Sequence, residues 1–129
     1  MLRIIGGTLR GRLIKSVPGL DTRPVLAQVK KSLFDILTPH LAGSYFLDLY
    51  AGTGSVGIEA ISRGATKVVF VDNSRRCRDI IRTNLTDLGL LAVTPEPEIW
   101  NFTLPQCLST QYKFNLIFIG APYKDKDKV

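Results

Sequence analysis

Apolar and polar residues alternate along the chain in blocks that predict strands separated by helices. Strands are expected at 45–50, 67–72 and 116–119, and helices at 55–63 and 75–88. Each of these helices is followed by a glycine, at Gly64 and Gly89, and glycine is the residue that most often ends a helix. Strands alternating with helices predict an α/β fold with a doubly wound, mainly parallel sheet.

The first forty residues predict a β-hairpin followed by a helix. Residues 3–17 have the pattern of two short strands around a Gly-Gly turn. From Pro24 onward, one helical face is expected to be buried, and its apolar positions are Val25, Val29, Leu33, Ile36, Leu37 and Leu41. Lys30, Lys31 and Asp35 are expected on the opposite, exposed face.

The segment 90–112 has no clear periodicity. Its TPEPE run, residues 94–98, is expected to be a loop broken by prolines, and LPQCL, residues 104–108, a short helix.

Composition limits the class of protein. A length of 129 residues with 45% hydrophobic content fits one globular domain. No apolar run approaches the roughly 20 residues that cross a bilayer, and the N-terminus lacks a secretory signal. Cys77 and Cys107 have neither metal-ligand spacing nor a disulfide framework. We therefore expect a cytoplasmic protein without a metal or membrane partner.

Positive charge is concentrated near the N-terminus. Residues 1–40 contain seven Lys or Arg against two Asp, whereas the rest contains ten basic and nine acidic residues. A basic arm on a nearly neutral body favours a polyanion such as nucleic acid, although a merely solvated surface fits as well. The arginines expected to contact the phosphates of such a partner are Arg10, Arg12 and Arg23, and Arg23 could instead cap a turn.

A glycine-rich turn lies between the strand 45–50 and the helix 55–63. Gly52, Gly54 and Gly57 have the spacing of a dinucleotide-binding loop, and Asp72 follows at the end of the next strand. Loop N–H groups at a helix N-terminus favour an anionic ligand group, and the acid suits ribose hydroxyls. The alternative is that these glycines only form a tight turn.

Asp48 discriminates between two cofactors that use such a loop. A carboxylate beside the loop would repel the pyrophosphate of NAD but suits the ammonium group of S-adenosylmethionine, directly or through water. Charge complementarity therefore favours the methyl donor. Asp48 could instead cap the turn. Glu59, one turn into the helix, is expected near the same ammonium group or as a partner of the helix dipole.

The segment DLYAGTGSVGIEA, residues 48–60, resembles motif I of class I S-adenosylmethionine-dependent methyltransferases. VVFVDNS, residues 68–74, resembles the acid-tipped second strand of that Rossmann-like fold. RIIGGTLRGR, TRP, VKKSLFDIL and FLDLYAGTGSVGIEAISRGA, in that order, resemble the RsmD family, which methylates the exocyclic N2 of a guanine in 16S rRNA. The resemblance implies cofactor contacts from Asp48, Ala51, Gly52, Thr53, Gly54, Asp72 and Asn73.

The family's fourth strand ends in an Asp/Asn-Pro-Pro-Tyr/Phe motif. Its first side chain and a backbone carbonyl accept hydrogen bonds from the target amino group, and its ring stacks on the flipped base. The matching residues here are Gly120, Ala121, Pro122 and Tyr123, so the polar anchor is missing. The resemblance thus implies a site in which the donor binds while turnover is weak or absent.

The resemblance also implies an organisation in two parts. Residues 1–41 are expected to form the RNA-contacting arm and residues 42–129 a partial donor-binding domain, truncated after the fourth strand. An open strand edge would allow self-association. The implied partner is 16S rRNA or the assembling small ribosomal subunit. The rival hypotheses are an inactive module that binds RNA or the donor and, less favoured, an NAD-dependent oxidoreductase.

Overall fold

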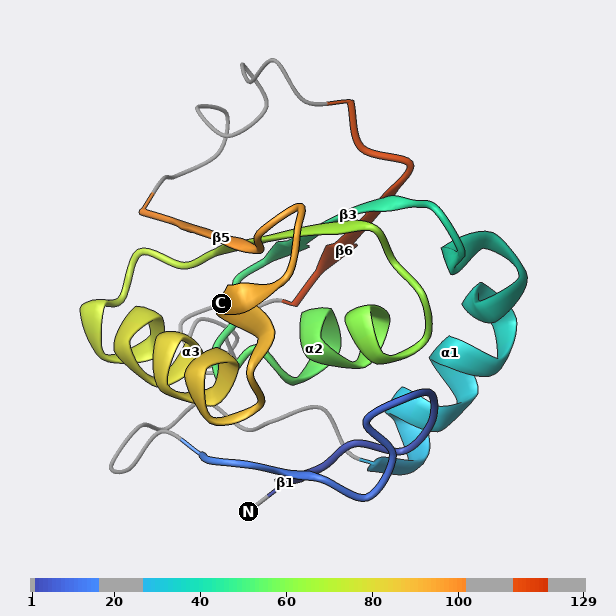
Figure 1. The fold of residues 1–129 in the computed structure, drawn as a ribbon, viewed down its shortest axis with the longest axis horizontal. Helices are drawn as coiled ribbons and strands as arrows, with labels where there is room; N and C mark the ends of the chain where they lie inside the picture. The colour runs from blue at the N-terminus through green and yellow to red at the C-terminus, as the bar shows by residue number, and fades with distance from the viewer. Residues whose placement is uncertain (1, 17–26, 102–112, 121–129) are drawn as a thin grey trace, which may run out of the picture.

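The computed structural model describes residues 2–16, 27–101 and 113–120 (Figure 1). In chain order, the elements are β1 Leu2–Arg3, β2 Leu13–Ile14, α1 Ala27–Leu41, β3 Tyr45–Leu49, α2 Ser55–Ser62, β4 Lys67–Val71, α3 Arg75–Asp87, the 3-10 helix η1 Leu90–Ala92, β5 Glu98–Trp100 and β6 Leu116–Ile119. The predicted α/β class is confirmed, as are the N-terminal hairpin and the predicted strands and helices of the described segments.

A parallel four-stranded sheet has the order β5-β4-β3-β6. From β3 the chain moves outward through β4 to β5, and it then returns to pair β6 with the other side of β3. The direction of winding therefore reverses between β3 and β6. In open α/β sheets, ligands bind outside the carboxyl ends of the strands at such a reversal.

The three helices lie on one side of the sheet, and the β1–β2 hairpin crosses them on the side away from it (Figure 1). One hydrophobic core joins the hairpin, α1, the other helices and the sheet. Its fully buried members include Ile4, Ile14, Phe34, Phe46 and Phe70. The basic arm and the sheet thus share a core.

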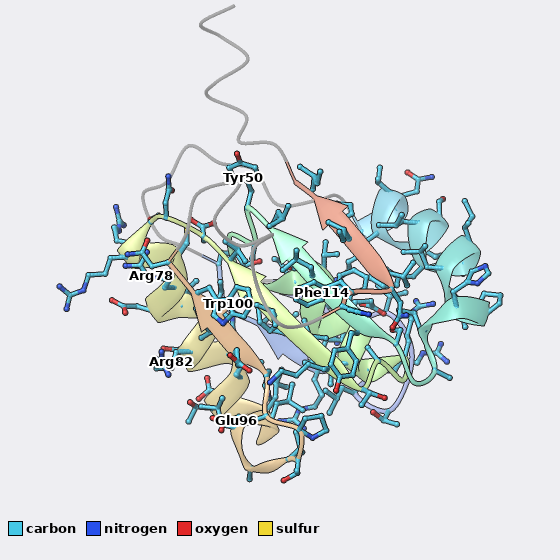
Figure 2. All side chains as sticks on the ribbon, turned by 90° about the horizontal axis from the view of Figure 1, so that it is seen from above. Tyr50, Arg78, Arg82, Glu96, Trp100 and Phe114 are labelled. Carbon is cyan, nitrogen blue, oxygen red and sulfur yellow. The ribbon has the colours of Figure 1, made fainter. Side chains whose placement is uncertain are left out.

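The opposite face of the sheet is apolar as well. Leu47, Leu49, Val69 and Val71 are buried there, with Trp100 and Phe114 packed against them (Figure 2). The rings of Trp100 and Phe114 meet edge to face, with centroids 6.3 Å apart. In register with these residues, the Ile117 and Ile119 side chains of β6 remain half exposed.

Helices α2 and α3 end just before the glycines that were predicted to stop them. Gly64 and Gly89 have φ values of 112° and 72°, the left-handed conformation that stops a helix at little cost for glycine. Ser74 caps the start of α3, because its hydroxyl accepts a hydrogen bond of 3.3 Å from the N–H of Cys77.

The predicted faces of α1 are wrong in part. Lys30, expected to be exposed, is buried, whereas Val29 and Ile36, expected in the core, are 56% and 72% exposed. Leu41 is fully buried as predicted, and Phe34, which was not predicted, is the other fully buried apolar residue of the helix. The reason is a charge: Lys30 is turned inward towards Glu59 of α2, with Nζ 3.3 Å from Oε1.

The expectation of a proline-broken loop over 94–98 is confirmed for residues 94–97, but it missed a strand that begins at residue 98. Glu98 begins β5, which pairs in parallel with β4 through Val69–Glu98, Phe70–Ile99 and Val71–Trp100. Three residues are too few for a recognisable alternation in the sequence. The short helix expected at 104–108 lies outside the described residues.

Candidate functional site

The glycine loop forms the carboxyl end of β3 and the start of α2. Gly52 and Gly54 both have positive φ, 60° and 83°, as their residue type allows. Gly54 is the N-cap of α2 and accepts a hydrogen bond of 2.9 Å from the N–H of Ile58. The loop therefore presents bare backbone at a helix N-terminus, the arrangement that suits an anionic group.

Asp72 joins the loop to the tip of β4. Its Oδ2 accepts a hydrogen bond of 2.9 Å from the N–H of Gly52, and its Oδ1 accepts one of 2.9 Å from the N–H of Ser74. Each carboxylate oxygen has two lone pairs, so both keep capacity for a further donor. Sequence reasoning paired Asp72 with the loop, and the structure brings them into direct contact.

Asp48 lies beneath the loop and is only 1% exposed. Its Oδ2 accepts a hydrogen bond of 3.0 Å from the N–H of Gly57, in the first turn of α2. Burial raises the pKa of the Asp48 carboxyl to about 7, with the Gly57 hydrogen bond opposing the rise and the charge of Asp72 adding to it. Asp48 thus holds the loop onto the helix, as the capping alternative expected.

Gly57 has a packing role rather than a conformational one. A Cβ at this position would lie 2.3 Å from the ring of Phe70 on β4, far inside van der Waals contact. The absence of a side chain lets α2 approach the sheet closely, which sets where the loop N–H groups point.

The other loop residues are fixed by backbone contacts. The N–H of Ala51 donates to the carbonyl of Val71 at 3.0 Å, and the hydroxyl of Thr53 accepts from the N–H of Ser55 at 3.3 Å. Asn73 is exposed beside Asp72 at the same edge of the sheet. The residues that the resemblance assigned to the donor therefore gather at the carboxyl ends of β3 and β4.

Gly120 follows β6 and lies next to the end of β3. Its N–H donates to the carbonyl of Leu49 at 3.0 Å. A Cβ built on it would lie 3.3 Å from the Phe118 ring and 3.4 Å from the carbonyl oxygen of Tyr50. This position lies across the reversal point from the glycine loop. Ala121, Pro122 and Tyr123 are outside the described residues.

Glu59 anchors the N-terminal arm. It is fully buried and accepts hydrogen bonds from the N–H groups of Ile5 at 3.0 Å and Gly6 at 2.9 Å. Lys30 and Arg63 pair with the same carboxylate, with nitrogen–oxygen distances of 3.3 and 2.8 Å. Glu59 was expected beside a cofactor ammonium group or as a partner of the helix dipole. In the structure its carboxylate instead holds the N-terminal arm.

Asn84 connects the arm to the glycine loop, a link that sequence reasoning missed. Its Nδ2 donates to the carbonyls of Lys15 and Thr53 at 3.1 and 3.0 Å, and its Oδ1 accepts from the N–H of Lys15 at 2.8 Å. The sequence did contain a signal for this link, because Asn84 is a polar residue on the apolar face of α3, beside the buried Ile81 and Leu85.

The predicted RNA-contacting arginines are only partly described. Arg10 and Arg12 are exposed in the connection between β1 and β2, and Arg12 donates to the carbonyl of Asp87 at 3.4 Å. Arg23 lies outside the described residues.

Within the described ranges, no group of three or more His, Cys, Asp or Glu residues could hold a metal ion. The helices of the described part are also too short or too polar to cross a membrane.

Comparison with known proteins identifies the family. A family model described as conserved hypothetical protein 95 matches residues 2–129. Bacillus subtilis YlbH is 36% identical over 97% of this chain and 68% of its own length. The ribosomal RNA small subunit methyltransferase D of Escherichia coli K12 is 37% identical over 95% of this chain and 61% of its own. The chain belongs to the RsmD family.

A solved structure agrees with this assignment. Escherichia coli YhhF has a TM-score of 0.79 and 30% identity, over 94% of this chain and 64% of its own. The chain spans between 61% and 68% of the Bacillus, Haemophilus and Escherichia relatives. The stretch shared with the RsmD family model includes the basic arm and the glycine loop.

Proposed function

We propose that this chain is the donor-binding part of an S-adenosylmethionine-dependent methyltransferase that modifies the exocyclic N2 of a guanine in 16S rRNA. The single observation that carries the proposal is the loop at 51–54, hydrogen-bonded to Asp72 and supported from below by the buried Asp48. Its RsmD relatives are named for methylation of small-subunit rRNA.

The residues of the site fit this donor by charge and shape. The exposed backbone of the loop suits the carboxylate of the donor, and Asp72 keeps lone pairs for the ribose hydroxyls. Asp48 places a carboxyl group under the loop, and in its ionised form, above its pKa of about 7, it favours a cationic ligand over a pyrophosphate. When bound, the sulfonium supplies an activated methyl group. Transfer would form a nitrogen–carbon bond, break the carbon–sulfur bond and release one amino proton.

The side of the site that receives the substrate is degenerate. At Gly120 no side chain can accept a hydrogen bond from the amino group, so one of the two acceptors that would align the nitrogen lone pair is missing. We therefore propose that donor binding persists while methyl transfer is slow. The alternative, an inactive module that binds RNA or the donor, is favoured by this same glycine.

The basic arm supports an RNA partner. Arg10 and Arg12 are exposed on the connection between β1 and β2, and Glu59 and Asn84 fix that hairpin to the donor-binding elements. We assign both arginines to contacts with RNA phosphates, which position a nucleic acid without reading its sequence.

Calorimetry tests the choice of cofactor. Titration with S-adenosylhomocysteine should give saturable binding, and titration with NAD should give none. Asp72→Asn should weaken the first by at least about tenfold, because it removes a charge-assisted acceptor. Asp79→Asn, on the exposed surface of α3, is the matched control and should change nothing. Binding of NAD in preference to S-adenosylhomocysteine would reject the proposal.

Asp48→Asn should stabilise the fold at alkaline pH and weaken donor binding. Since the pKa of Asp48 is raised to about 7, the unfolded chain loses this proton at a lower pH than the folded chain. Folding therefore becomes less favourable as the pH rises from about 4 to 7, and asparagine removes that penalty. Thermal unfolding should show a larger gain for the variant at pH 8 than at pH 5. Equal gains at both pH values would contradict this account.

A further inference from the structure

Tyr50 has an unusual backbone conformation at the carboxyl end of β3. Its φ is 57°, and among the described residues it alone has a positive φ without being glycine. A bulky aromatic residue in this region is sterically disfavoured, and such strain persists where surrounding structure and function require it. A tyrosine here therefore needs a reason beyond local preference.

Packing does not supply that reason. The Tyr50 side chain is 43% exposed, whereas Phe34, Phe46 and Phe70 are fully buried. Figure 2 shows Tyr50 standing out from the edge of the sheet at the ends of the strands. A large apolar ring is thus presented to solvent at a strained position.

The position of Tyr50 is next to both halves of the site. It directly precedes the loop that includes Gly52, and its carbonyl oxygen lies 3.4 Å from where a Cβ of Gly120 would be. Since β3 lies between β4 and β6, Tyr50 marks the point where the winding of the sheet reverses. Tyr50 therefore lies between the glycine loop and Gly120 at this edge of the sheet.

We propose that Tyr50 is a stacking residue that holds the target base beside the methyl donor. An unpaired base loses the stacking of its neighbours and regains it on an aromatic ring. The exposed ring of Tyr50, already fixed by its backbone, offers such a surface. This inference rests on the proposed function, because it assumes an RNA base at this edge of the sheet.

The test uses an RNA hairpin whose loop contains 2-aminopurine in place of an unpaired guanine. Its fluorescence is quenched by stacking, and the same hairpin with an abasic site is the control. We expect Tyr50→Leu to abolish the quenching and weaken binding of the 2-aminopurine hairpin about tenfold, with no change for the abasic hairpin. Tyr50→Phe should retain both properties. Unchanged quenching in Tyr50→Leu would overturn the proposal.

Tyr50→Gly separates stacking from a structural role. Glycine relieves the positive φ but adds freedom to the unfolded chain, so this variant should melt close to the wild-type temperature while losing the quenching. A large fall in melting temperature would mean that the ring holds the fold, and would overturn the assignment. If the wild type binds S-adenosylhomocysteine but does not quench the fluorescence, the stacking role of Tyr50 is rejected and the proposed function is not. Quenching without binding of S-adenosylhomocysteine would reject the proposed function, and with it the placing of the base beside a donor, leaving Tyr50 only as a stacking residue of an RNA-binding module.

Discussion

Replacing Glu59 with alanine is expected to destabilise the fold by about 3–5 kcal/mol, the usual cost of breaking a buried ion pair. The carboxylate is fully buried and receives hydrogen bonds from Ile5, Gly6 and Arg63 at 2.8–3.0 Å. Its removal leaves two backbone N–H groups without their acceptor and the buried ammonium of Lys30 without its counter-charge. A loss of this size is a large fraction of a typical domain's stability.

The buried charge of Lys30 accounts for most of the expected loss of stability in Glu59→Ala. Lys30 is 2% exposed, and its Nζ also donates to the carbonyl of Arg3 at 3.2 Å. Burial lowers the pKa of Lys30, while the charge and hydrogen bond of Glu59 raise it. Replacing Lys30 with methionine in the Glu59→Ala background should therefore recover part of the loss, because no unpaired charge stays buried.

The same pair predicts acid sensitivity. Although burial opposes it, the hydrogen bonds from Ile5, Arg63 and Gly6, with the charge of Lys30, lower the pKa of Glu59. A carboxyl group with a depressed pKa stabilises the fold above the usual glutamate range, and this contribution is lost as pH falls through the folded-state pKa. The wild type should therefore lose stability more steeply on acidification than the Glu59→Ala variant.

Urea unfolding at neutral and acidic pH measures both effects. Asp35→Asn is the matched control, because Asp35 and Lys31 form an exposed pair at 3.0 Å whose loss should cost under about 0.5 kcal/mol. A cost for Glu59→Ala as small as that of Asp35→Asn would show that the buried cluster does not hold the arm.

The sequence predicted the elements of the fold better than the orientation of α1. Helical spacing placed Val29 and Ile36 in the core because both are apolar, yet a single charged pair turned Lys30 inward instead. Lys30 and Glu59 are separated by 29 positions in the chain. No local pattern indicates that two such charges will meet, because the contact depends on how α1 crosses α2.

The glycine loop was predictable because its residues are close together in the sequence. Spacing alone identified the glycines and an acid at the end of the next strand. The hydrogen bond between Asp72 and the N–H of Gly52 was not predicted, and the ribose contact of Asp72 stays a prediction. The strained conformation of Tyr50 was not predictable, since tyrosine after an apolar strand looks like one more strand residue. Strand β5 was not predictable either, because it has only three paired residues and directly follows a proline-rich segment.

Restoring an acceptor at position 120 should raise methyl transfer by about 10²–10³-fold, the effect of one aligned hydrogen-bonding group in a pre-organised site. Gly120→Asp fits if the Phe118 ring shifts by a few tenths of an ångström. The nearest atoms to a new Cβ are 3.3–3.7 Å away, on the movable ring of Phe118 and two backbone carbonyls. The new carboxylate would extend beyond β6, across the reversal point from the loop that we assign to the donor.

The assay is transfer of a labelled methyl group from S-adenosylmethionine to small-subunit rRNA, with S-adenosylhomocysteine binding measured on the same samples. Gly120→Ala is the matched control, because it adds the same Cβ without an acceptor and should give no gain. Gly120→Asn should give a smaller gain than the aspartate, since its amide oxygen accepts without a charge. Equal gains from alanine and aspartate would mean that backbone stiffness limits the reaction. Unchanged donor binding with no gain from aspartate would favour the inactive binding module over the enzyme.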